Sequence, residues 1–227
     1  VWYYTGKNVK QDYKVALDWW AKSAKQNNPD GIGNMAMCYQ LGNGIKKDSV
    51  MAMTLYKSAI KKGNASIIPQ HEKIVKNSGS VFSARLLMDC YQNGIGVKRD
   101  LKKVETYQEV LAKSGDVDAQ FALALSCLNS KRSEKAAKYF ALAAKKGKKE
   151  AIYYQGFLLF NGMGVEQDKE KGLALMTQAA EKNLPAAQYQ VGRAYYEGDG
   201  VAKDIAKAQR YLGAAAGKNK NAAWMLG

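Results

Sequence analysis

The chain has 227 residues, 47% of them hydrophobic, and a formal net charge of +15. Its apolar stretches are all far shorter than the roughly 20 residues that a membrane-spanning helix needs, so the sequence predicts no membrane span. A single histidine and three widely spaced cysteines exclude an ordinary zinc site, and we expect no metal and no cofactor.

One motif, Y-x-x-G-x-G-V/I-x-x-D, recurs along the chain after a degenerate first copy that ends at Asp12. Its aspartates lie at positions 12, 48, 100, 168 and 204, which are 36, 52, 68 and 36 residues apart. The interval of 68 contains one more unit, with Arg132 at the aspartate position, so that interval divides into steps of 32 and 36. A period close to 36 residues predicts a repeat array. The glycine and aspartate positions that recur in the four fuller copies are Gly42, Gly44 and Asp48; Gly94, Gly96 and Asp100; Gly162, Gly164 and Asp168; Gly198, Gly200 and Asp204.

Each unit carries two apolar patterns with helical spacing, and no run alternates with period two, so the sequence predicts an all-α fold. In chain order we expect a partial repeat at 1–29, repeats at 30–64, 81–116, 117–148, 149–184 and 185–220, and a partial repeat at 221–227. Because the sequence starts and stops inside a repeat, we expect it to be a piece of a longer protein. The segment at 65–80 is an insertion that contains His71, and we expect an added helical turn or two there, as structural elaboration rather than a docking element.

The motif is expected to connect the two helices of a unit. Its first glycine would end the first helix, because glycine adopts positive φ at little cost. The Val or Ile would return to the core, and the aspartate would cap the second helix. A phosphate-binding loop is the alternative for Gly-x-Gly, but here the motif follows a helix and lacks both a third glycine and a Gly-Lys-Ser/Thr ending.

The full pattern, A-x-x-x-L-G-x-x-Y-x-x-G-x-G-V-x-x-D-x-x-K-A-x-x-W/Y-x-x-x-A-A, is almost complete over residues 187–216. It resembles the Sel-one-like repeat (SLR) family, a relative of the tetratricopeptide repeat. Cys127 and Leu159 depart from the pattern by replacing the motif tyrosine. The resemblance implies a right-handed α/α solenoid of helix-turn-helix repeats that serves as an adaptor for proteins or peptides.

The same resemblance implies that the first helix of each unit lines a concave face. Aromatic residues are frequent at the inward positions of the C-terminal half, where Arg193 could meet a carboxylate, whereas the N-terminal half is more polar. The alternative, left open here, is that these side chains pack on one another between units. The candidate binding residues are Phe121, Tyr153, Phe157, Phe160, Tyr189, Arg193, Tyr196 and Trp224.

No nucleophile and base recur at a motif spacing, so we expect no catalytic residues and no enzyme activity. We expect a protein–protein interaction scaffold that binds a protein or peptide, and the net charge suggests an acidic one. Alternatives are an envelope protein that binds polysaccharide or organises a secretion complex, and a basic nucleic-acid binder. Lysine supplies all but five of the 35 basic residues, which disfavours nucleic acid.

The cysteines do not form a recognisable disulfide pattern. Cys38 and Cys90 occupy equivalent positions in successive motif-bearing units, about a helix diameter apart and beyond disulfide reach, so we expect buried thiols. The compartment stays open between cytoplasmic and exported or periplasmic, and the family resemblance favours a bacterial exported protein.

Overall fold

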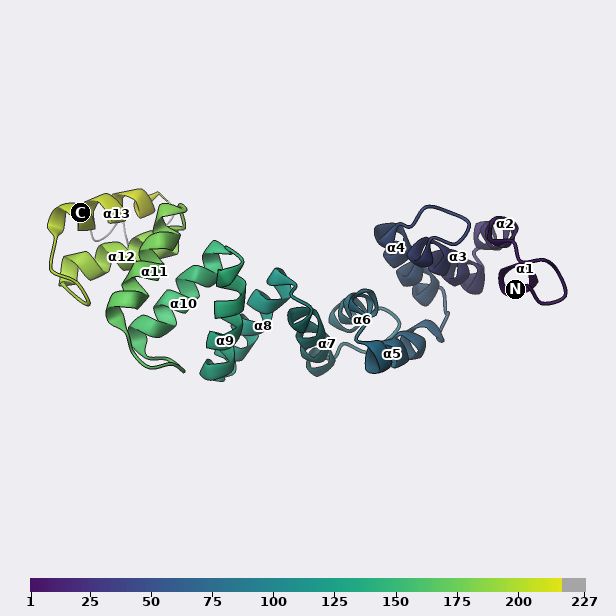
Figure 1. The fold of residues 1–227 in the computed structure, drawn as a ribbon, viewed down its shortest axis with the longest axis horizontal. Helices are drawn as coiled ribbons and strands as arrows, with labels where there is room; N and C mark the ends of the chain where they lie inside the picture. Colours follow the sequence, from purple (N-terminus) through teal and green to yellow (C-terminus); the bar gives the residue numbers. More distant parts are fainter. Residues whose placement is uncertain (218–227) are drawn as a thin grey trace. The chain divides into compact units, whose positions relative to one another are not determined.

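The computed structural model describes residues 1–217, which form helices and turns and contain no strand (Figure 1). This confirms the predicted all-α fold class. The helices of this part of the chain are α1 (Trp2–Thr5), α2 (Tyr13–Lys25), α3 (Pro29–Leu41), α4 (Ser49–Lys61), α5 (Ile67–Ser78), α6 (Val81–Asn93), α7 (Leu101–Lys113), α8 (Val117–Asn129), α9 (Ser133–Lys145), α10 (Lys149–Asn161), α11 (Lys169–Glu181), α12 (Pro185–Glu197) and α13 (Ile205–Ala216).

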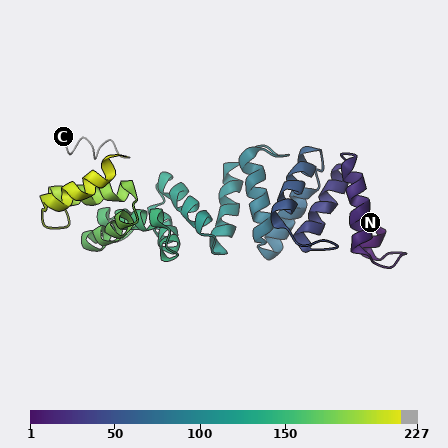
Figure 2. The same cartoon turned by 90° about the horizontal axis from the view of Figure 1, so that it is seen from above.

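The helices fall into two compact units, one from Val1 to Leu111 and one that begins at Ala112. In the second unit, α8 packs on α9, α10 on α11 and α12 on α13, and each pair also packs on the next. In the first unit, α3 packs on both α2 and α4, and α5 packs on α6. Within each unit, helices that follow one another in the chain lie side by side (Figure 2).

The motif forms the turn between the two helices of a pair. Its first glycine ends the first helix in the left-handed region, with a φ of 83° at Gly42 and 67° at Gly162. Its aspartate is the N-cap of the second helix, where one carboxylate oxygen of Asp48 accepts from the backbone N–H groups of Val50 and Met51, each at 2.9 Å. These contacts satisfy donors that a helix start otherwise leaves unpaired.

A backbone hydrogen bond closes every one of these turns. The N–H of Asp48 donates to the carbonyl of Tyr39 at 2.9 Å, and the N–H of Asp168 donates to the carbonyl of Leu159 at the same distance. In the shortened turn, the N–H of Arg132 donates to the carbonyl of Cys127 at 2.8 Å. Since the bond uses only main-chain atoms, the turn closes even where the motif tyrosine is replaced.

The second glycine of the motif lies against the preceding pair of helices. A Cβ atom on Gly44 would lie 2.5 Å from the carbonyl oxygen of Tyr13, and one on Gly164 would overlap the backbone of Ser133 and Glu134. Tyr13 and Ser133 are the first residues of α2 and α9. The turn of one pair therefore packs on the start of the second helix of the previous pair.

The inserted segment forms a complete helix, α5, of 12 residues, longer than the expected turn or two. Ile67, Ile68 and His71 are buried on one face of it, and this burial stabilises a full three turns. Gly79, with a φ of 63°, ends the helix.

Candidate functional site

Except for Trp224, the predicted binding residues come from α8, α10 and α12, the first helices of three pairs in the second unit. Tyr196 is 45% exposed. Trp224 lies outside the residues that the structure describes. The partly buried members of the set are Phe121, Tyr153, Phe157, Tyr189 and Arg193.

Phe160 is the exception, because it is only 7% exposed and belongs to the hydrophobic core between α10 and α12. Its ring would lie 2.9 Å from a Cβ atom on Gly200, so the next motif turn covers it. We therefore remove Phe160 from the candidate surface. The family resemblance predicted that Phe160 faces an open concave surface, but the motif turn that contains Gly200 covers its ring.

The aromatic side chains of α8, α9 and α10 form one cluster that runs from the core to the surface. Phe140 is fully buried and stacks on Tyr154 with ring centroids 4.8 Å apart. Phe121 lies 5.7 Å from Phe140, and Tyr153 lies 5.1 Å from Tyr154 and 6.1 Å from Phe157. Tyr154 and Phe140 are not among the residues predicted from the sequence, although Phe140 lies in an apolar run of helical spacing.

Tyr153 on α10 interacts with Gln190 and with the charge of Arg193 on α12 at this surface. Burial raises the pKa of Tyr153, while a hydrogen bond with Gln190 and the charge of Arg193 act in the opposite direction. Arg193 Nε lies 3.7 Å from Glu197 Oε2 one turn along its own helix. A partly exposed pair of this kind contributes little to stability, so a ligand carboxylate could replace Glu197 at small cost.

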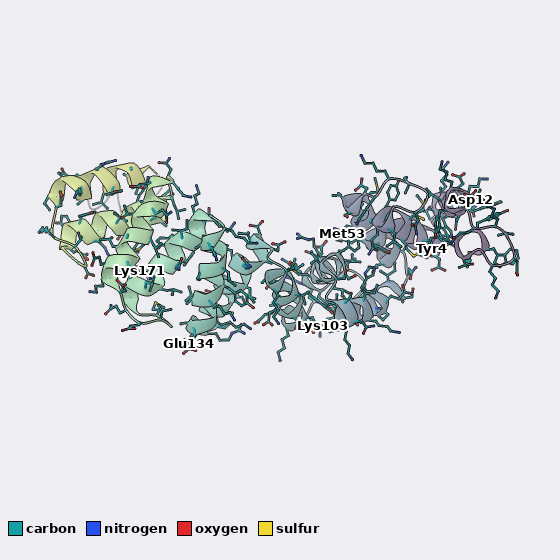
Figure 3. The ribbon with its side chains drawn as sticks, viewed as in Figure 1. Tyr4, Asp12, Met53, Lys103, Glu134 and Lys171 are labelled. Atoms are coloured by element: carbon teal, nitrogen blue, oxygen red, sulfur yellow. The ribbon has the colours of Figure 1, made fainter. Side chains whose placement is uncertain are left out.

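A polar cluster missed by the sequence analysis joins α5 to α6 and α7 in the first unit. Glu72 Oε1 accepts from Lys103 Nζ at 2.7 Å and from the hydroxyl groups of Tyr91 at 2.8 Å and Tyr107 at 3.3 Å. Burial opposes ionisation of Glu72, but these hydrogen bonds, led by that from Lys103, hold its pKa below the ordinary value. Figure 3 labels Lys103, whose Nζ also lies 4.4 Å from the centroid of the Tyr91 ring. The cluster fixes the inserted helix to its neighbours.

His71 is 3% exposed, and its Nδ1 lies 2.8 Å from Ser83 Oγ, which is also buried. The Tyr56 ring contacts the imidazole edge-on at 4.8 Å between ring centroids. Burial lowers the pKa of His71 to about 4, which keeps the ring neutral at physiological pH. Because both side chains are enclosed, the histidine and serine are part of the core and do not form an accessible nucleophile and base.

The three cysteines, Cys38, Cys90 and Cys127, are buried, and none forms a disulfide. Burial raises the pKa of Cys38 and of Cys90 to about 11, so both stay protonated. Within residues 1–217, no group of three or more histidine, cysteine, aspartate or glutamate side chains is placed to hold a metal ion. No helix in that range is long and apolar enough to cross a membrane.

Six segments of the chain match the family described as the Sel1 repeat, at residues 1–28, 29–64, 84–103, 117–148, 149–184 and 185–220. The chain belongs to the Sel1 repeat family. The resemblance to Sel-one-like repeats is thereby confirmed. Sel1 repeats are non-catalytic and typically build scaffolds for protein–protein interaction. The matches leave out 65–83, the range that contains α5.

Two solved Sel1 repeat structures are similar to this chain. One is a protective antigen from uropathogenic Escherichia coli strains with an SLR fold, 25% identical, with a TM-score of 0.56 over 97% of this chain. The other is a Sel1 repeat protein from Oxalobacter formigenes, 25% identical, with a TM-score of 0.54 over 96% of this chain and 84% of its own. The present chain spans 52% of the length of the E. coli protein. No curated protein matches the sequence.

Proposed function

We propose that this chain is a non-enzymatic interaction scaffold. It binds a protein or peptide on the face formed by α8, α10 and α12, the first helices of the pairs in its second unit. The observation that carries the proposal is the group of partly exposed aromatic residues Tyr153, Phe157, Tyr189 and Tyr196 around Arg193 on α10 and α12. Tyrosine and arginine are the side chains that most often dominate protein interfaces. The net charge of +15 favours an acidic partner.

The aromatic residues of this face also pack against the core of the second unit. Tyr153 and Phe157 pack against the core shared by α10, α11 and α12, and Tyr189 packs against Leu212 and Ala215 of α13. Each ring therefore has one side on the protein and one side toward solvent. A partner that covers the solvent side would bury apolar area without moving the backbone.

The test is recovery of the partner from the native source on the immobilised chain. The double variant Tyr153→Ala/Tyr189→Ala should lower recovery about tenfold or more, because truncating a hot-spot tyrosine costs about 2 kcal/mol or more and about 1.4 kcal/mol is a tenfold change in affinity. Tyr211→Ala is the matched control, since it removes a partly buried tyrosine from α13, a second helix. Equal recovery with the wild type and the double variant would exclude this face.

Unfolding of the same variants separates a binding role from a core role. Phe140→Ala should cost about 3–5 kcal/mol, as for other fully buried aromatics. Tyr153→Ala and Tyr189→Ala should each cost clearly less. If either matches Phe140→Ala in urea denaturation, that ring is a core residue and the proposed face fails.

A further inference from the structure

Insertion of α5 changes how two neighbouring helices meet. In the second unit the second helix of one pair packs directly on the first helix of the next, as α9 packs on α10 and α11 on α12. Around α5, only limited contact remains between α4 and α6. The ring of Tyr56 on α4 contacts His71 on α5 and Phe82 on α6, at 4.8 and 6.0 Å between ring centroids. The three helices therefore meet at Tyr56.

α4 and α6 run parallel and in register. Lys57 Nζ lies 2.7 Å from Asp89 Oδ2, and each residue is eight positions after the first residue of its helix, at Ser49 and at Val81. The first turns of both helices line the same cavity. Because direct contact between them is limited, α4 and α6 form the two walls of a groove that the Lys57–Asp89 ion pair spans.

The end of this groove at the two helix starts is a cavity of about 470 Å³. Its apolar lining comes from Val50 and Met53 on α4 and from Val81 and Phe82 on α6. Val50 is 78% exposed and Val81 is 40% exposed, so neither wall is covered by the residues that the structure describes. Met53 is labelled on α4 in Figure 3. The volume falls in the range of roughly 300–1,000 Å³ that is usual for ligand pockets.

A second cavity, of about 1030 Å³, continues along the same two helices to the motif turn after α6. Thr54 and Lys57 line both cavities, so the Lys57–Asp89 ion pair lies where they meet. Helices of 13 residues are about 20 Å long, which matches roughly six residues of extended chain. The groove therefore fits a peptide segment better than a small ion.

The lysine and arginine side chains along the groove favour an acidic ligand. The cavity at the helix starts is lined by the cations Lys57 and Arg85 and by no carboxylate, and Lys61 and Lys62 line the second cavity. The carboxylate in the second cavity is Asp89, which is paired with Lys57. Beside the first, the Asp48 carboxylate caps α4, so the lysine and arginine side chains outnumber the carboxylates by four to two around the groove. The positive dipole end of α6, which is capped by the neutral Ser80, also faces this end of the groove, whereas Asp48 offsets that of α4.

We propose that the α4–α6 groove binds an extended acidic peptide that places one apolar side chain against Val50, Met53, Val81 and Phe82. This inference rests on the proposed scaffold function and assigns it a second surface, in the first unit. The apolar pocket would hold the anchor, and the lysines along the groove would hold the acidic residues beside it. The inserted helix would then have a binding role, since it separates α4 from α6.

The test is selection of peptides from a phage-displayed random dodecapeptide library on the full chain. Selected peptides should be rich in aspartate and glutamate around a leucine, methionine or phenylalanine. Their affinities are then measured by fluorescence anisotropy with synthetic labelled copies. Val50→Asp should weaken binding about tenfold by placing a like charge at the pocket, and Val50→Lys should preserve or strengthen it.

Val50 suits this test because it is 78% exposed, so both replacements should leave folding intact, as circular dichroism will verify. Leu101→Asp is the matched control, an exposed apolar residue in the first turn of α7, and should not change affinity. Tyr153→Ala/Tyr189→Ala should also leave affinity unchanged. If the selected peptides lose affinity only in that double variant, the scaffold function stands and the groove is wrong. Recovery of no peptides, or of peptides without acidic residues, also overturns the groove.

Discussion

Replacing Gly164 by alanine should lower the free energy of unfolding by about 2–5 kcal/mol. The residue has a φ of 71°, and an L side chain in that region costs about 1–2 kcal/mol. The added methyl group would also overlap the backbone of Ser133 and Glu134 at the start of α9, and overpacking of this kind costs about 1–3 kcal/mol. Urea denaturation followed by circular dichroism measures the change.

Gly147→Ala is the control for this prediction. Gly147 has a φ of 86°, but no atom lies within 4 Å of a Cβ placed there. Its replacement should therefore cost only the backbone strain, about 1–2 kcal/mol. If Gly164→Ala is no more destabilising than Gly147→Ala, the motif turn does not pack closely on the preceding pair.

Stability should fall by about 2 kcal/mol between pH 7 and pH 5 because of His71 alone. Its pKa is about 4 in the folded chain against 6.5 for an unperturbed histidine, so the unfolded chain takes up the proton first as the pH falls. The stabilisation from neutral His71 is full above pH 6.5 and is lost as the pH falls toward 4. One unit of difference in pKa corresponds to about 1.4 kcal/mol. Urea denaturation at the two pH values measures the loss.

His71 is the only histidine in the chain, which makes this prediction easy to isolate. Most carboxylates titrate below this window. His71→Gln should remove most of the pH dependence between pH 7 and 5, even if it lowers stability overall. A proton NMR titration of the single imidazole gives a direct reading. A midpoint near 6.5 in the folded chain would contradict the buried, neutral state.

The architecture could be predicted from the sequence because its determinants are local. A glycine that ends a helix and an aspartate six residues later that caps the next one act within a single turn. The contact of the second glycine with the previous pair was not predicted. Gly44 meets Tyr13, Gly164 meets Ser133 and Gly200 meets Lys169, in each case 31 residues earlier in the chain.

Gly96 shows why the insertion was harder to interpret. The position 31 residues before it is 65, at the beginning of the inserted segment, and a Cβ on Gly96 would instead overlap Ile60 near the end of α4. The sequence indicates that residues are added there. It does not indicate that α4 and α6 become parallel neighbours, because this depends on where α5 packs.

The candidate surface was predictable only in part. Helical spacing places Tyr153, Phe157 and Phe160 near one another on α10, but it does not distinguish a ring that faces solvent from one that faces the next turn. Phe160 is buried because Gly200 belongs to a turn that covers it. That contact depends on the packing of successive pairs and leaves no local sequence signal.

Hydrogen–deuterium exchange of the full chain, with and without its recovered partner, tests the central claim most directly. The scaffold account predicts that binding protects peptides from α10 and α12, around Tyr153 and Tyr189, while peptides from α9 and α11 exchange at unchanged rates. Protection confined to α9 and α11, or no protection at saturating partner, would contradict it.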